Sequence, residues 1–357
     1  MKIGLCHNLY GELSRGGAET AVSLMADELL RAGHEVFLIT TKPAGYEISD
    51  TKPRQDAYPI YYLKSEYRNL DKHGFIFRFS WQISNIFSFK KYRQIKKLLA
   101  SLQPDLVITH NLMGLGFLTP LALRRLKIRQ EHFLHDLQLL YPSGLMIWGQ
   151  EKKLQSLAAK IYRVLTWILF GSPAKIISPS KWLMSEHDRY GFFPASEKEI
   201  RPFHWPSAGA LKATRSDKET RFIFIGQIEA QKGVFLLIEA FSKTKNENFR
   251  LTFAIRGGGS GLTEAKKLAQ NDKRITFLGP LSFEETENIK MNSDYLIVPS
   301  LCYENSPTVV YGAKAIGLPV IASNIGGIPE LLSPGDRTFR PGDVEDLKQK
   351  IEESQRN

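Results

Sequence analysis

Short apolar runs alternate with amphipathic helical stretches along nearly the whole chain. In the first half, the apolar runs lie at 3–6, 36–40, 106–109, 131–134 and 175–178. A second series lies at about 221–225, 250–255, 274–278, 294–298 and 318–322. This alternation is typical of parallel strands joined by crossover helices. The predicted fold class is therefore α/β.

The domain organisation follows from the length and from a break between the two series. A chain of 357 residues is too long for one ordinary core. Two X-Pro steps, Arg201-Pro202 and Trp205-Pro206, are followed by a polar run. We predict a Rossmann-like domain at 1–203, a hinge at 204–219 and a second Rossmann-like domain at 220–357, facing each other across a cleft. Ligands of such sheets bind outside the carboxyl ends of the strands.

Cysteine usage and hydropathy indicate the compartment. Cys6 and Cys302 lie far apart and form no disulfide or metal-ligand framework, which fits a reducing compartment. The N-terminus predicts a first strand and has no signal-peptide h-region. Apolar stretches fall short of the ~20 residues that span a bilayer. We expect a cytoplasmic protein, with peripheral attachment to the inner face of the membrane as an open alternative.

The net charge of +11 is concentrated at 64–97, where nine basic residues accompany two acidic ones. Aromatic residues are interleaved with them: Phe75, Phe77, Phe79, Trp81, Phe87, Phe89 and Tyr92. One interpretation, which we favour, is a helix pair with aromatics in the core and basic residues in solvent. The other is attachment to an anionic membrane or an acidic acceptor. Nucleic acid is not expected, because no recognition motif accompanies the charge. Residues 152–170 predict a long, apolar, basic helix, which we expect to pack on the sheet rather than on a membrane.

The most informative stretch for function is 300–330. An apolar run ends before a polar turn that carries Glu304, and a helix is predicted at 307–316, closed by Gly317. Free backbone N–H groups at such a turn bind a phosphate well.

Three further loops follow strands. Gly16 and Gly17 precede a predicted helix, and Lys232 stands at a strand-to-helix turn where it can meet a diphosphate. The glycine cluster at 256–261 is similar to a dinucleotide fingerprint but follows the second strand of its domain, and no ribose-binding acid follows it.

A histidine followed by a second polar residue stands after each of two consecutive strands of the first domain: His110-Asn111 and His135-Asp136. Such pairs can bind hydroxyls or transfer protons. No cluster in the sequence has metal-ligand spacing.

Taken in order, these stretches resemble the retaining glycosyltransferases of family 4, which have the two-domain GT-B fold. The resemblance rests on GGAE at 16–19, HDLQLLYP at 135–142, SPSKW at 178–182, IGQIEAQKG at 225–233, IRGGGSG at 255–261, FLGPLS at 277–282, ENSPTVVYGAKAIGLPVIAS at 304–323 and GGIPE at 326–330.

The resemblance implies roles for individual residues. Glu304 matches the first of two paired glutamates and contacts the donor sugar, while Asn305, Ser306, Pro307 and Thr308 match the turn that holds sugar and diphosphate. Lys232 matches a diphosphate ligand, and Gly16 and Gly17 match a loop that closes over the donor. The implied catalytic residues are His135 and Glu304. The implied donor-binding set also includes Gln227, Gly257, Pro280 and Gly312; His110, Asn111 and Asp136 are expected to bind the acceptor. The family needs no metal or cofactor, because basic groups and a helix N-terminus stabilise the leaving diphosphate.

The sequence departs from the family in three places. Gly312 stands where the second glutamate, which holds the donor ribose, is expected. Gln227 replaces an arginine that commonly pairs with the lysine on the diphosphate, and it brings no charge. The chain also stops at Asn357, where the family usually continues into a helix that crosses back to the first domain.

The expected function is retaining transfer of a sugar from a nucleotide-diphosphate sugar to a saccharide or lipid-linked acceptor in cell-surface polysaccharide or glycolipid synthesis. Two alternatives stay open: a degenerate homologue that binds nucleotide sugar or a partner with little turnover, motivated by Gly312, Gln227 and the short C-terminus, and a Rossmann-type oxidoreductase.

Overall fold

The computed structural model describes the chain except residues 15, 48–57, 204, 206–217, 257–258 and 355–357, and the side chains of 71 and 283. The chain divides into two compact units. Unit 1 is Met1–Gly144 with Lys152–Pro202, and unit 2 is Leu145–Glu151 with Phe203–Asn357. The predicted hinge at 204–219 lies almost wholly outside the described residues.

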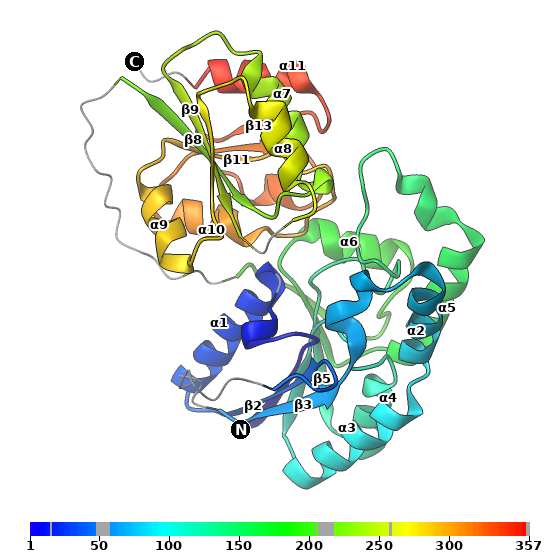
Figure 1. The fold of residues 1–357 in the computed structure, drawn as a ribbon. Helices are drawn as coiled ribbons and strands as arrows, with labels where there is room; N and C mark the ends of the chain where they lie inside the picture. The colour runs from blue at the N-terminus through cyan, green and yellow to red at the C-terminus, as the bar shows by residue number, and fades with distance from the viewer. Residues whose placement is uncertain (15, 48–57, 204, 206–217, 257–258, 355–357) are drawn as a thin grey trace. The chain divides into compact units, whose positions relative to one another are not determined.

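Unit 1 is built on a parallel sheet of seven strands in the order β3-β2-β1-β4-β5-β6-β7 (Figure 1). Its strands are β1 (Lys2–Cys6), β2 (Glu35–Lys42), β3 (Ile60–Lys64), β4 (Leu106–Thr109), β5 (Arg129–Phe133), β6 (Lys175–Ser178) and β7 (Glu197–Ile200). Its helices are α1 (Gly17–Arg31), α2 (Phe75–Ile86), α3 (Phe89–Leu102), α4 (Thr119–Leu126), α5 (Leu157–Phe170) and α6 (Lys181–Arg189), with short 3-10 turns at Gly11–Leu13, Glu66–Lys72 and Glu151–Gln155.

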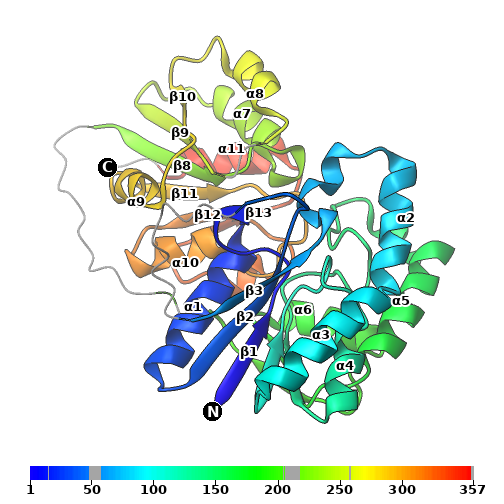
Figure 2. The same ribbon diagram turned by 60° about the horizontal axis from the view of Figure 1, so that its bottom comes forward.

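Unit 2 contains a second parallel sheet, of six strands in the order β10-β9-β8-β11-β12-β13 (Figure 2). Its strands are β8 (Thr220–Gly226), β9 (Phe249–Ile255), β10 (Ile275–Leu278), β11 (Tyr295–Val298), β12 (Val320–Ser323) and β13 (Arg337–Phe339). Its helices are α7 (Val234–Ser242), α8 (Leu262–Ala269), α9 (Phe283–Met291), α10 (Thr308–Ala315) and α11 (Val344–Glu352), with 3-10 turns at Ala230–Lys232 and Ile328–Leu331. The α/β class with two Rossmann-like sheets is confirmed.

The ends of the predicted strands agree with the structure to within two residues. Three strands were not predicted: β3, β7 and β13. All three are edge strands, and their side chains are mostly half-buried or exposed. An edge strand does not need the continuous apolar run by which a buried parallel strand is recognised.

The favoured interpretation of the basic, aromatic segment is wrong for α2. Phe75 is 80% exposed and Phe79 is 58% exposed, so these aromatic rings are not in the core. The same helix turns only Asn85 and Ile86 fully inward. The neighbouring α3 is more conventional, because it buries Ile95 and Leu99.

The predicted helix at 152–170 is broken into a 3-10 turn and α5. Ser156 causes the break as the N-cap of α5, where its side-chain oxygen accepts a hydrogen bond from Ala159 N at 3.3 Å. The inner face of α5 packs as expected, with Ala159, Tyr162 and Phe170 buried. Its outer face remains apolar and exposed, which the sequence pattern did not predict.

Candidate functional site

The turn between β11 and α10 in unit 2 brings the predicted donor-binding charges together. Lys232 Nζ lies 2.9 Å from Glu304 Oε1, and Ser300 Oγ donates to the same oxygen at 2.5 Å. The carboxylate is 15% exposed and the ammonium side chain 31% exposed, so both are sheltered yet reachable. The two residues, 72 positions apart, form the ion pair at the centre of this site.

The ion pair fixes both protonation states. Burial alone raises the pKa of Glu304, but the Lys232 charge and the Ser300 hydroxyl outweigh it, so this pKa is lowered. Burial alone lowers the pKa of Lys232, but the Glu304 charge reverses the effect and raises it. The carboxylate and the ammonium are therefore both ionised at neutral pH.

The backbone around Glu304 is held from two sides. Leu301 N and Cys302 N both donate to the carbonyl of Gln231, which directly precedes Lys232. Gly327 N donates to the carbonyl of Glu304 at 2.8 Å. These bonds fix the carboxylate and the ammonium relative to each other.

Two glycines make this close packing possible. A Cβ on Gly233 would lie 1.7 Å from the Pro299 carbonyl oxygen, and one on Gly326 would lie 2.3 Å from that of Glu304. Both residues have positive φ, of 73° and 62°. Side chains are excluded from both positions by space and by backbone conformation.

Residues 145–151 come from between β5 and α5 but belong to unit 2. Trp148 N donates to the Leu301 carbonyl, and Tyr303 N donates to the Met146 carbonyl, both at 2.8 Å. Tyr303 OH also donates to Glu151 Oε1 at 2.9 Å. This short antiparallel pairing is a third support for the Glu304 turn, and it was not predicted.

The other predicted residues of the turn lie where α10 begins. Asn305 is buried, Ser306 Oγ shares a hydrogen bond with Tyr311 OH at 2.7 Å, Pro307 is the N-cap and Thr308 the first helical residue. Gln227 is half-buried directly after β8. Pro280 follows β10 through a cis peptide bond, and Gly257 lies outside the described residues.

Gly312 lies in the second turn of α10, and an ammonium fills the space beside it. A Cβ at this position would lie 2.6 Å from Lys290 Nζ and 3.7 Å from the Trp205 ring. Lys290, on α9, is only 2% exposed and lies 2.6 Å from Glu287 Oε2. The position where the resemblance implies a carboxylate is thus bordered by the buried ammonium of Lys290, which pairs with the half-buried Glu287.

In unit 1, a cluster of histidines lies at the carboxyl ends of β1, β4 and β5. His110 Nδ1 lies 2.8 Å from His135 Nε2, so the two predicted histidines are hydrogen-bonded to each other. His7 lies against both, with ring centroids 5.9 Å from His110 and 5.7 Å from His135. His7 was not predicted; its signal was its place directly after the first strand.

Burial keeps these histidines uncharged. It lowers the pKa of His7 to about 3, and it lowers the pKa values of His110 and His135 well below 6.5, with neighbouring histidines adding to the effect. Within the described chain, neither ring nitrogen of His7 has a hydrogen-bond partner, and neither does Nε2 of His110.

Asp136 and Asn111 form the second half of this cluster. Asn111 Nδ2 donates to one carboxylate oxygen of Asp136 at 3.0 Å, and Gln138 N donates to the other at 2.7 Å. Burial outweighs both bonds and raises the Asp136 pKa to about 6. Asp136, Asn111 and the two predicted histidines line a cavity of about 10 Å³, about the room that one water needs.

The glycine loop of unit 1 begins α1 at Gly17. Gly16 N donates to Glu19 Oε2 at 3.0 Å, so the carboxylate of the GGAE motif already occupies one amide of the helix N-terminus. Glu19 is itself buried and was not among the predicted site residues. Among the described residues, no group of three or more His, Cys, Asp or Glu side chains is arranged so that it could hold a metal ion.

Comparison with known proteins adds the evolutionary context. The model of the family described as Glycosyltransferase Family 4 matches residues 15–201, and that of Glycosyl transferases group 1 matches residues 211–357. An uncharacterized 42.6 kDa protein in the cps region of Klebsiella pneumoniae is 24% identical over 97% of this chain and 91% of its own length. A D-inositol 3-phosphate glycosyltransferase of Corynebacterium efficiens is 32% identical, over only 32% of this chain and 28% of its own.

Solved structures with the same fold extend over the whole chain. Anabaena Alr3699/HepE, solved in complex with UDP-glucose, has a TM-score of 0.70 at 15% identity, over 99% of this chain and 89% of that one. A sucrose-phosphate synthase from Thermosynechococcus elongatus has a TM-score of 0.68 at 18% identity, over 99% and 89%. The lipopolysaccharide outer core galactosyltransferase WaaB has a TM-score of 0.65 at 16% identity, over 99% and 90%.

Proposed function

The chain belongs to glycosyltransferase family 4, and from that premise we propose that it transfers a sugar from a nucleoside-diphosphate sugar to a saccharide or lipid-linked acceptor with retention of configuration. The observation that carries the proposal is the Lys232–Glu304 ion pair beside the N-terminus of α10. The carboxylate accepts hydrogen bonds from sugar hydroxyls, while the ammonium and the helix amides face a diphosphate.

In the proposed reaction, the bond between the anomeric carbon and the diphosphate oxygen breaks and a bond to the acceptor oxygen forms on the same face. The acceptor proton passes to a phosphate oxygen of the donor. Lys232 stabilises the charge that develops on the leaving diphosphate, because a fixed cation requires no reorganisation during the step. Glu304 orients the sugar and forms no covalent bond with it.

His135 is assigned to the reacting centre and His110, Asn111 and Asp136 to the acceptor. Uncharged imidazoles support this role, because they offer hydrogen bonds to acceptor hydroxyls without adding a competing cation. Gly16 and Gly17 are assigned to the donor, with no metal ion or cofactor in the reaction.

The test is a thermal-shift screen against UDP, GDP and ADP, followed by their sugars and by transfer assays with the hit. UDP comes first, because HepE was solved with UDP and with UDP-glucose. Binding of one nucleotide raises the melting temperature by mass action. No shift with any nucleotide at millimolar concentration would refute the proposed donor class.

A second candidate is a degenerate homologue that binds nucleotide sugar without turnover. Gly312 supports it, since a glycine stands where the resemblance implies the ribose-binding carboxylate, and Lys290 Nζ borders that position. A nucleotide hit without transfer or donor hydrolysis would favour this candidate over an active enzyme. The biosynthetic role in cell-surface glycans and the cytoplasmic location stay predictions.

A further inference from the structure

The outer face of α5 in unit 1 is a continuous apolar stripe. Leu157, Ile161, Val164 and Ile168 follow one another at helical spacing, and each is more than half exposed, from 55% for Ile161 to 74% for Leu157. Large contiguous apolar surface on a soluble domain marks an interaction site.

The helix is held firmly by its other face, so the stripe is not a loosely attached segment. Tyr162 OH donates to the Gln138 carbonyl and Thr166 Oγ1 to the Leu139 carbonyl, both at 2.7 Å. Arg124 Nη1 donates to the Phe170 carbonyl at 2.6 Å and anchors the C-terminal end. The apolar side chains are therefore presented on a rigid support, directly behind the loop that carries His135 and Asp136.

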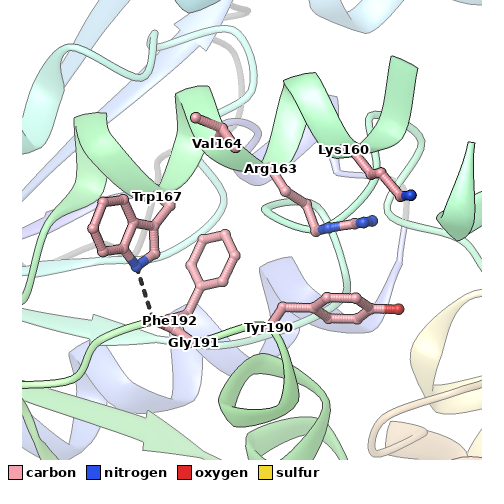
Figure 3. A pocket seen from close by; sticks show the side chains of 7 residues that line it. All are labelled: Lys160, Arg163, Val164, Trp167, Tyr190, Gly191 and Phe192. Atoms are coloured by element: carbon pink, nitrogen blue, oxygen red, sulfur yellow. Dashed lines mark hydrogen bonds between the residues drawn. The ribbon is translucent and has the colours of Figure 1, made fainter. Parts of the chain in front are cut away.

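A pocket of about 400 Å³ lies beside the stripe (Figure 3). Lys160, Arg163, Val164 and Trp167 line it from α5, and Tyr190 to Phe192 line it from the end of α6. Trp167 Nε1 donates to the Gly191 carbonyl at 2.8 Å and joins the two walls. Its volume falls within the range of small-molecule sites.

Two cations, Arg163 and Lys160, line this pocket. Arg163 is 9% exposed, its guanidinium stacks on the Tyr190 ring at 4.2 Å, and Nη1 donates to the Leu154 carbonyl at 2.5 Å. Among the described residues, neither Arg163 nor Lys160 forms an ion pair. A buried guanidinium oriented by an aromatic ring, next to an exposed ammonium, favours an anion, and phosphate above all.

Three helices of unit 1 share a positive charge balance. Neither α2, α3 nor α5 contains an acidic residue, while α3 carries Lys90, Arg93 and Lys97 on exposed positions. Figures 1 and 2 both draw α2 and α5 next to each other at one side of unit 1. Both helices carry exposed apolar side chains, such as Phe75 and Ile76 on α2 and Leu157 and Ile161 on α5.

We propose that the pocket binds the phosphate head group of an anionic membrane lipid, whose acyl chains pack along the exposed face of α5. Exposed apolar side chains at helical spacing enter the head-group and acyl boundary, and basic residues hold the anionic surface. Every helix in the described chain is too short or too polar to cross a bilayer, so the bound helix lies along the interface. The inference does not depend on the glycosyl donor.

The test is co-sedimentation of the full chain with vesicles of phosphatidylglycerol and phosphatidylcholine mixed at graded ratios. Binding is expected to rise with the phosphatidylglycerol fraction and to fall with salt. Lys160→Glu changes the local charge by two units and should weaken binding roughly 30-fold. Lys267→Glu, an equal charge change at an exposed site on α8, is the matched control and should weaken it far less.

The apolar contribution is tested separately. Ile161→Asn with Ile168→Asn should weaken binding at least about 10-fold, whereas Leu268→Asn, at an exposed leucine of α8, should leave it within about twofold. Thermal melts establish that each variant is folded. Unchanged donor binding in Lys160→Glu would show that the lipid site is independent of the donor site of the proposed transfer reaction.

Four results would overturn the proposal. Binding that is equal for both lipids, or equally weakened by the α5 and α8 variants, would mean that the pocket and stripe are not the lipid site. A thermal shift with inorganic phosphate that Lys160→Glu removes, without vesicle binding, would make it a soluble-anion site. A dimer in sedimentation velocity that the double Asn variant dissociates, without vesicle binding, would make the stripe a contact between two copies.

Discussion

The ion pair of unit 2 and the histidine cluster of unit 1 use burial in opposite ways. In unit 2, Lys232 and Glu304 are sheltered together, and mutual attraction keeps both ionised. In unit 1, His7, His110 and His135 are sheltered with one another, and burial keeps all three neutral. The difference is the partner: a buried group retains its charge only beside an opposite one. Under the proposed function, the ion pair of unit 2 would meet a charged diphosphate and the histidine cluster of unit 1 the uncharged hydroxyls of an acceptor.

The largest effect is expected at the ion pair. Glu304→Ala should reduce kcat/KM at least about 100-fold, because it removes a sugar contact and leaves Lys232 without its carboxylate. Steady-state transfer or donor hydrolysis, with the donor found by thermal shift, measures it. Glu239→Ala on α7 is the control: this exposed glutamate pairs with Lys243, and its removal should change the rate less than about twofold. Near-normal turnover in Glu304→Ala would refute its assigned role.

Substitution in the histidine cluster of unit 1 should lower turnover almost as strongly. His135→Ala is expected to lower turnover about 100-fold, with the larger share in kcat if the imidazole acts at the reacting centre. His34→Ala, at the amino end of β2 and away from the cluster, is the matched control. A rate in His135→Ala equal to that of the His34 variant would leave the acceptor side without its proposed central group.

Much of this arrangement was predictable from the sequence, and the limits have a physical cause. Buried strands such as β4 and β11 could be predicted because each is a short apolar run. Glycines that precede helices indicated the loops. Lys232 and Glu304 were each predicted, but their ion pair joins positions 72 apart, and only the fold brings them together. Lys290 was missed for the same reason, since its relation to Gly312 depends on how α9 packs against α10.

The exposed apolar faces show a second limit. Helical periodicity predicts that α2 and α5 each bury one face. It does not show which of their apolar residues lie outside that face and stay exposed. α5 carries apolar residues nearly all round, so its buried and exposed sides look alike in the sequence. The structure is needed to show that the stripe faces outward.

The neutral histidines also predict how stability depends on pH. The pKa is lowered to about 3 for His132 and to about 4 for His187, in both cases chiefly by burial. A lowered histidine pKa means that the unfolded chain binds protons first, so stability is full above about pH 6.5 and is lost as pH falls. Each such histidine contributes up to roughly 1.4 kcal/mol per pH unit. Asp136 has the opposite effect: because its pKa is raised from 3.8 to about 6, its contribution to stability falls as the pH rises through that range.

Urea unfolding at pH 7.5, 6 and 5 checks this dependence. His187→Asn removes one titrating group outside the site while an amide takes over the hydrogen bond that His187 Nδ1 makes with the Leu183 carbonyl. It should flatten the slope below pH 6.5 by about 1 kcal/mol per unit. Equal slopes for the variant and the native chain would show that this histidine is not held neutral by burial.

The smallest effect is expected at Gly312, where the buried ammonium of Lys290 stands beside a residue without a side chain. Gly312→Glu supplies the carboxylate that the family resemblance implies, but its Cβ would lie 2.6 Å from Lys290 Nζ. The ammonium is the end of a flexible side chain and can shift, so the variant should fold. The new carboxylate would then pair with Lys290, as Glu304 pairs with Lys232, instead of accepting hydrogen bonds from a ribose. Donor affinity should therefore change less than about threefold.

Removing the Lys290 ammonium should leave a glutamate at position 312 free to bind the nucleotide. In Gly312→Glu with Lys290→Met, the added glutamate has no cation beside it and should strengthen nucleotide binding by about tenfold, as a hydrogen bond to a charged group does. Lys290→Met alone and Gly312→Ala are the matched controls; the latter should add up to about 1 kcal/mol of stability through helix propensity. Calorimetric titration with the nucleotide measures all four variants. If Gly312→Glu alone strengthened binding tenfold or more, Lys290 would not control this position, and the native glycine would be the simple loss of an anchor, as the degenerate-homologue hypothesis requires.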